Sequence, residues 1–160
     1  MYRALGDGLY STATAVEKAA FAAAQTADPD LRVAGQAALV VMDLLVNFNK
    51  PIFTRNTTPY GVRYKGSGEI DIETTKALVE VTTQSKANGK VAQLVRLLSA
   101  ERNYFDGIVT VPHPNVPKPV LFYMPRLSNP ASGSARRLRA SGAHGVYNSL
   151  AALEAALRGL

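Results

Sequence analysis

Cysteine and tryptophan are absent from this chain of 160 residues, and its apolar runs are short. Without cysteine there is neither a disulfide bond nor a thiolate zinc site. The longest apolar stretch, residues 37–48, is interrupted by Asp43 and Asn47 and is shorter than the roughly 20 residues that span a bilayer. We therefore expect no stable membrane insertion, and the first residues lack the pattern of a cleavable signal peptide.

Charged residues are also scarce. Asp, Glu, Lys and Arg make up 19% of the chain, whereas 47% of it is hydrophobic. This composition is typical of a folded domain and excludes a disordered polyelectrolyte. We expect one compact domain overall, in which an N-terminal helical extension over residues 1–28 precedes the main domain over residues 29–160.

Acidic residues are missing from one whole region, residues 107–153, which carries five cations. The net charge of the chain is +6, which favours an anionic partner. Arg136, Arg137 and Arg139 follow a loop rich in Ser, Pro and Gly, and we expect them to contact nucleic-acid phosphates. The alternative for each of these arginines is an ordinary charged helix face.

Hydrophobic periodicity predicts an α/β chain with the element order α, α, β, β, β, α, β, β, α, β, α. Helices are expected over residues 11–26, 29–48, 90–102, a short basic stretch after residue 134, and 149–158. Strands are expected over residues 60–65, 69–73, 77–83, 107–111, 119–124 and 145–147. The second helix should be buried, because its second half is apolar nearly all round.

The acidic residues gather in one place. Four of the 12 lie within a dozen positions, at Glu69, Asp71, Glu73 and Glu80. Pairing residues 69–73 with residues 77–83 as a hairpin puts four aliphatic side chains on one face, those of Ile70, Ile72, Val79 and Val81. Asp71 and Glu80 then lie on the other face as diagonal neighbours, with Cα atoms roughly 7–8 Å apart.

Two such carboxylates can share one divalent cation, which would relieve their mutual repulsion. Hard oxygen ligands without cysteine suit Mg²⁺ or Mn²⁺ rather than structural zinc. Beside a basic surface, a cation held between carboxylates is an arrangement that cleaves phosphodiesters. The alternative is a solvent-facing sheet surface that is merely acidic.

Two stretches of this hairpin, Gly68-Glu69-Ile70-Asp71-Ile72 and Leu78-Val79-Glu80-Val81-Thr82, resemble the core of the PD-(D/E)xK nuclease superfamily. The resemblance covers about residues 29–124. It implies a restriction-endonuclease-like fold, with a mixed central sheet flanked by helices and here an additional N-terminal helix. It also implies that Asp71 and Glu80 bind the metal ion and act in catalysis.

Thr82 stands where this superfamily has its lysine, so the resemblance implies an amine supplied from the next helix, by Lys90 or Lys86. Lys90 is favoured, because a continued strand would carry Lys86 roughly 20 Å from Glu80. Gln93 shares a stripe of the expected helix with Lys90 and is a candidate for positioning phosphate or water. The alternative for Gln93 is a plain surface position.

Asp43 is a further candidate metal ligand. The superfamily often adds an acid from the helix before the sheet, and Asp43 is a lone carboxylate in a nearly all-apolar stretch. Such a group is costly to bury unless it is paired or bound to a metal. The alternative is a surface position on the narrow polar edge of that helix.

The small, basic, cysteine-free chain also resembles the C-terminal toxin domain of contact-dependent growth inhibition effectors. Several such toxins have this nuclease fold and cleave tRNA, and each is neutralised by a cognate immunity protein. The resemblance implies a metal-dependent ribonuclease acting on tRNA, with an acidic immunity protein as partner. It implies delivery from a secreted or cell-surface effector into the target-cell cytoplasm. The alternatives are a DNA-cleaving nuclease and a non-catalytic nucleic-acid-binding module.

Overall fold

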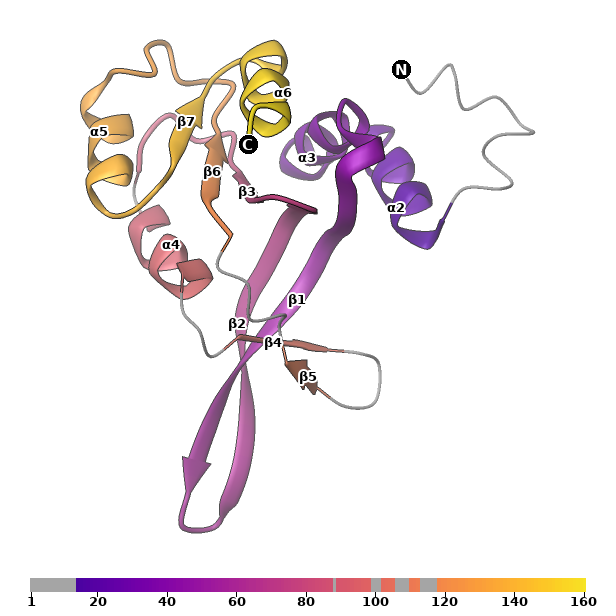
Figure 1. Ribbon diagram of the computed structural model, residues 1–160, viewed down its shortest axis with the longest axis vertical. Helices are drawn as coiled ribbons and strands as arrows, with labels where there is room; N and C mark the ends of the chain where they lie inside the picture. Colours follow the sequence, from indigo (N-terminus) through magenta and orange to yellow (C-terminus); the bar gives the residue numbers. More distant parts are fainter. Residues whose placement is uncertain (1–13, 88, 99–101, 106–109, 113–117) are drawn as a thin grey trace.

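The structure is a computed structural model that describes residues 14–87, 89–98, 102–105, 110–112 and 118–160 (Figure 1). Within these residues the chain forms five α-helices and a mixed sheet with the strand order β5-β4-β1-β2-β3-β6-β7. Strands β1, β2, β3, β6 and β7 make up the body of the sheet, and β4 and β5 extend one edge. The expected mixed α/β fold with helices around a mixed sheet, N-terminal helices included, is confirmed.

Helices α2 (Ala15–Ala24) and α3 (Pro29–Leu39) form the N-terminal pair. Thr14 and Glu17 close a reciprocal capping box at the start of α2. The two helices pack very closely, because a Cβ atom added at Gly35 would lie only 2.4 Å from the backbone nitrogen of Ala24. The sequence predicts this helix from residue 11, but α2 begins at Ala15, and residues 11–13 lie outside the described residues. The domain boundary after residue 28 stays a prediction.

The helix expected over residues 29–48 is wrong in its second half. Helix α3 ends at Leu39, a 3₁₀ turn spans Met42–Leu44, and strand β1 (Leu45–Thr58) follows. The alternation of apolar and polar residues from Val46 to Asn49 fits a strand, and pairing with β2 stabilises it there. An apolar stretch of this length does not by itself distinguish a buried helix from a strand.

Strand β2 (Gly61–Thr74) is a single strand where two strands and a turn were expected. The register shifts by one residue, because Ile52 pairs with Gly68 whereas Phe53 pairs with Gly66. The two glycines therefore flank a β-bulge and do not form the expected turn. Together β1 and β2 make a long hairpin that extends away from the rest of the molecule (Figure 1).

Strand β3 (Leu78–Val81) pairs antiparallel with β2, so the expected hairpin is confirmed. Glu73 lies opposite Leu78 and Ile72 lies opposite Val79, a register two residues away from the one expected. Continuing this register brings Asp71 directly opposite Glu80, where the sequence placed the two acids diagonally.

The second half of the chain completes the sheet through crossovers. Helix α4 (Lys90–Leu98) leads to strands β4 (Arg102–Phe105) and β5 (Thr110–Pro112), and then β6 (Val120–Tyr123) runs parallel to β3. The helix expected through residue 102 is wrong at its end, because Arg102 begins an unexpected strand. The strand expected over residues 107–111 overlaps β5 only in part, and residues 106–109 lie outside the described part.

The last three elements agree closely with expectation: α5 (Gly133–Ala140), β7 (Gly145–Tyr147) and α6 (Leu150–Arg158). Ser149 caps α6 by accepting a hydrogen bond from the backbone of Ala152 at 3.2 Å. No helix within the described residues is long and apolar enough to span a membrane.

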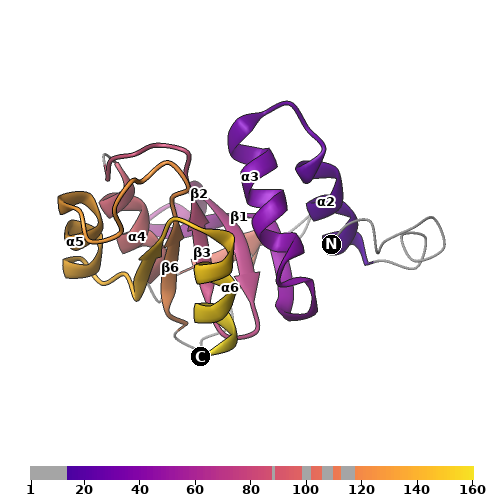
Figure 2. The ribbon, with the colours of Figure 1, turned by 90° about the horizontal axis from the view of Figure 1, so that it is seen from above.

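Helices cover both faces of the sheet (Figure 2). Helices α2, α3 and α6 lie on one side and α4 and α5 on the other, and each side has its own apolar cluster. The half-buried sheet expected from the alternation is therefore wrong for β3, all four of whose residues are buried. The single apolar face is wrong as well, because Ile70 lies in the cluster with α4 whereas Ile72 lies in the cluster with α3.

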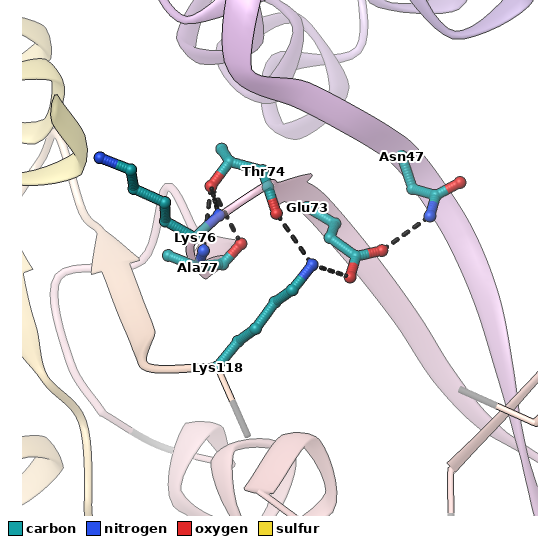
Figure 3. Close-up of polar contacts among 6 residues, drawn as sticks. All are labelled: Asn47, Glu73, Thr74, Lys76, Ala77 and Lys118. Carbon is teal, nitrogen blue, oxygen red and sulfur yellow. Dashed lines mark hydrogen bonds and ion pairs between the residues drawn. The ribbon is translucent and has the colours of Figure 1, made fainter. Parts of the chain in front are cut away.

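A buried polar network joins the start of β6 to the turn between β2 and β3 (Figure 3). Glu73 is only 1% exposed, and its carboxylate accepts from Lys118 Nζ and from Asn47 Nδ2, both at 2.7 Å. The same ammonium donates to the backbone oxygen of Thr74 at 3.0 Å. The Thr74 hydroxyl closes the turn by accepting from the backbone of Lys76 and Ala77.

We predict that Lys118→Met lowers the free energy of unfolding by about 3–5 kcal/mol, because Glu73 would then be a buried charge without its cation. Urea denaturation at neutral pH measures the change. The double variant with Glu73→Gln should recover part of the loss, since its side chain no longer carries the charge. Equal stability of Lys118→Met and the parent would show that the ion pair does not hold this turn.

Candidate active site

Asp71 of β2 and Glu80 of β3 meet on neighbouring strands. Asp71 Oδ2 accepts a hydrogen bond from the backbone nitrogen of Val81 at 2.8 Å, which fixes its carboxyl against β3. Glu80 is only 2% exposed, and its Oε2 atom is buried without a hydrogen-bond partner among the described residues. An orphaned buried carboxyl oxygen costs stability and is rare in folded proteins.

The surroundings of Glu80 strongly favour its neutral form. Burial, together with a hydrogen bond to the Asp71 carboxyl and the charge of that carboxyl, raises the pKa of Glu80 to about 10. The positive charge of Lys90 acts in the opposite direction. Without a cation, Glu80 therefore keeps its proton at neutral pH.

Lys90 is the first residue of α4, and its field reaches Glu80 from the helix that follows β3. Its Nζ atom donates a hydrogen bond to Gln93 Oε1 at 3.2 Å, one helical turn further on. The structure thus brings together four of the residues singled out in the sequence, namely Asp71, Glu80, Lys90 and Gln93.

A hollow of about 280 Å³ adjoins the Asp71 carboxyl. It is lined by Asp28, Asp30, Leu31 and Ala34 of α3 and its cap, Phe48 and Asn49 of β1, Glu69 and Asp71 of β2, and Val81. Burial and the charge of Asp71 raise the pKa of Glu69. With its amide nitrogen turned toward Glu69, Asn49 donates to both carboxylate oxygens at 2.8 and 2.9 Å. The hollow is therefore anionic.

Three acids of this hollow were not expected at the site. The sequence assigns Asp28 and Asp30 to a helix start, and Asp28 does cap α3 through its bonds to the backbone of Asp30 and Leu31. Asp30 also accepts from the backbone and hydroxyl of Thr83, which ties α3 to the end of β3. The sequence did contain a signal that Glu69 lies near the site, because Glu69 stands two residues before Asp71 in the acidic group.

Asp43 does not join Asp71 and Glu80. It lies in the 3₁₀ turn with its side chain 63% exposed, and Arg158 Nη1 of α6 lies 2.8 Å from its Oδ2. Hydrogen bonding by Arg158 lowers the pKa of Asp43. The salt bridge with Arg158 thus accounts for the lone carboxylate of Asp43.

Throughout the described residues, no three His, Cys, Asp or Glu side chains are grouped so that they could hold a metal ion.

The remaining candidates lie elsewhere. Lys86 is exposed in the loop after β3, and Arg136, Arg137 and Arg139 are exposed on α5. Arg139 reaches back to the backbone oxygen of Val146 at 3.5 Å. These positions leave all four cations accessible to a large anionic partner.

Thr82, where the sequence resemblance led us to look for a lysine, has a structural role. It is buried, and its hydroxyl accepts a hydrogen bond from the backbone of Gln84 at 3.1 Å. This bond shapes the loop that leads away from β3. The amine near Glu80 accordingly comes from α4 and not from β3.

Comparison of the chain with protein-family models, with curated proteins and with solved structures finds no significant match.

We predict that Glu80→Gln makes the protein more stable at pH 8 in EDTA, with little effect at pH 4. The folded state holds the Glu80 proton up to a pKa of about 10, whereas the unfolded state releases it near 4.5. The parent's stability should therefore fall as pH rises through this interval, with a slope of up to about 1.4 kcal/mol per pH unit. Glutamine removes that slope.

Urea denaturation at pH 4, 6 and 8 measures this difference. Glu154→Gln is the matched control, because that carboxylate belongs to an exposed salt bridge with Arg158. It should leave the pH dependence unchanged. Parallel pH profiles for the parent and Glu80→Gln would contradict the raised pKa of Glu80.

Proposed function

We propose that this chain is a metal-dependent nuclease whose active centre consists of Asp71, Glu80 and Lys90. The observation that carries the proposal is the buried, unpartnered Oε2 atom of Glu80 beside the Asp71 carboxyl and in the field of Lys90. Such a group weakens the fold, and strongly perturbed carboxyl groups are concentrated at functional sites.

The donor set fits Mg²⁺ or Mn²⁺, with Asp71 and Glu80 as the protein ligands. Mg²⁺ is commonly held by one or two carboxylates together with water and substrate phosphate, so a third acid is not required. A bound ion would replace the proton on Glu80 and satisfy its orphaned oxygen. The ion supplies Lewis-acid stabilisation of the phosphate and lowers the pKa of a water ligand.

Lys90 and Gln93 act on the charge that develops at the phosphate. The Lys90 ammonium stands at the first turn of α4, where it stabilises the additional negative charge of the transition state. Gln93 accepts a hydrogen bond from this ammonium, which restricts its position. We assign Lys90 a catalytic role and Gln93 a positioning role.

The order of the elements supports the likeness to the PD-(D/E)xK superfamily. Strands β1, β2 and β3 form an antiparallel meander, and α4 leads onward to β6, which runs parallel to β3. Asp71 lies on the second strand of the meander and Glu80 on the third, as the sequence resemblance implies. We infer a restriction-endonuclease-like domain over residues 29–160.

The biological setting follows from the same resemblance. We infer a toxin domain of a contact-dependent growth inhibition effector, delivered into the target-cell cytoplasm and acting on tRNA. The net charge of +6 and the exposed arginines of α5 favour a nucleic-acid substrate held by its phosphates. The same charge favours an acidic immunity protein, whose association it would accelerate.

We predict that the purified chain cleaves tRNA in Mg²⁺ and not in EDTA. Asp71→Asn and Glu80→Gln should each lower single-turnover cleavage at least about 100-fold, because each removes a ligand that steadies transition-state charge. Asp43→Asn is the control and should keep full activity, since Asp43 pairs with Arg158 away from the site. Gel analysis of tRNA and of plasmid DNA measures the outcome.

Each other outcome identifies a different function. Full cleavage in EDTA would overturn the metal-dependent mechanism. Cleavage of plasmid but not of tRNA would identify a DNA nuclease. Salt-sensitive binding of RNA without cleavage would identify the non-catalytic module.

We predict that the two lysines differ in their kinetic roles. Lys90→Ala should lower the maximal single-turnover rate at least about 100-fold with substrate affinity mostly kept, because its charge acts in the transition state. Lys86→Ala should keep that rate and weaken binding. Gln93→Ala should lose less than Lys90→Ala, and its rate should vary with pH differently from that of the parent. An unchanged rate in Lys90→Ala would remove Lys90 from the mechanism.

A further inference from the structure

A second hollow, of about 380 Å³, lies where β3 and β6 end. It is lined by Thr83, Gln84, Ser85, Lys86 and Arg126. We propose that this hollow is a phosphate subsite, which binds a backbone phosphate of a single-stranded nucleic acid beside the one that is cleaved. The inference rests on the proposed function, because it assigns a substrate contact to the same active site.

The topology places the hollow at the edge of the sheet where ligands commonly bind. Strands β3 and β6 are parallel, with Val81 opposite Tyr123, so their carboxyl ends lie side by side. The loop after β3 supplies Lys86 and the loop after β6 supplies Arg126. In sheets with parallel strands, ligands bind beyond the carboxyl ends.

The chemistry of the lining fits a phosphate group. Lys86 and Arg126 are both exposed, and neither has a hydrogen-bond or ion-pair partner in the part of the chain that the structure describes. Gln84 and Ser85 add exposed polar side chains, and none of the described residues that line the hollow is an acid. Arginine offers a planar set of donors to phosphate, and lysine offers a compact charge.

The position of the hollow suits a neighbouring nucleotide. Thr83 is three residues beyond Glu80, which corresponds to roughly 10 Å along an extended chain. The hydroxyl of Thr83 contacts Asp30, so a residue that lines the basic hollow touches one that lines the anionic hollow. The anionic hollow repels phosphate, whereas the basic hollow attracts it. A single-stranded nucleic acid whose reacting phosphate lies at Glu80 would therefore place another of its phosphates near Lys86 and Arg126.

Binding of a single-stranded RNA oligonucleotide, measured in the Glu80→Gln background at several salt concentrations, tests the subsite. Lys86→Ala and Arg126→Ala should each weaken binding, and each should reduce the slope of log K against log salt by about 0.7 if one phosphate contact is lost. Arg32→Ala is the matched control, because it removes an exposed arginine of α3 that lines neither hollow. It should leave the slope unchanged.

Cleavage by the parent and binding by the variants are read separately. An unchanged affinity and salt slope in the Lys86→Ala, Arg126→Ala double variant would overturn the subsite, whether or not the parent cleaves RNA. A reduced slope in the double variant supports the subsite, and if the parent then cleaves nothing, only the proposed catalysis fails. Inorganic phosphate gives a second readout: amide NMR shifts at residues 83–86 should appear in the parent and vanish in the double variant.

Discussion

The buried ion pair of Glu73 and Lys118 holds the register on which the rest of the structure depends. Lys118 precedes β6, and by binding both Glu73 and the Thr74 backbone it joins the β2–β3 turn to the start of the parallel strand. A slip of one residue in this pairing would turn Asp71 and Glu80 to different surroundings. The constraint at one end of β2 therefore sets the geometry of the carboxyl pair at the other end.

Two glutamates of the same strand pair show how partners decide the role of a buried acid. Glu73 receives a cation and an amide, which compensate for its burial. Glu80 is as deeply buried but keeps an orphaned oxygen, and Lys90 is engaged with Gln93. The first arrangement stabilises the fold, whereas the second leaves a place for a proton or a metal ion. Within the acidic group of the sequence, the fold thus satisfies Glu73 and leaves an orphaned oxygen on Glu80.

Charge is segregated around the candidate site as well. Acids from α3 and β2 surround the hollow beside Asp71, while Lys86 and Arg126 occupy the hollow beyond the ends of β3 and β6. The proposed cleavage of a nucleic acid would use both features, a cation between carboxylates at the reacting phosphate and fixed cations for the neighbouring phosphates. Thr83 lines the second of these hollows, and its contact with Asp30 holds α3 against the end of β3.

The sequence by itself determined the start of helix α3, helix α6, strands β6 and β7, and the shared parity of Asp71 and Glu80, because helix starts and local alternation are encoded in neighbouring residues. It also pointed to Lys90, since a continued strand would carry Lys86 roughly 20 Å from Glu80. Only the tertiary structure decided that residues 45–48 form a strand and not the end of a helix, because they pair with β2. The tertiary structure alone shows that Asp43 pairs with Arg158, 115 residues away, and that Glu73 pairs with Lys118, 45 residues away. Local sequence patterns do not indicate a partner so distant in the chain.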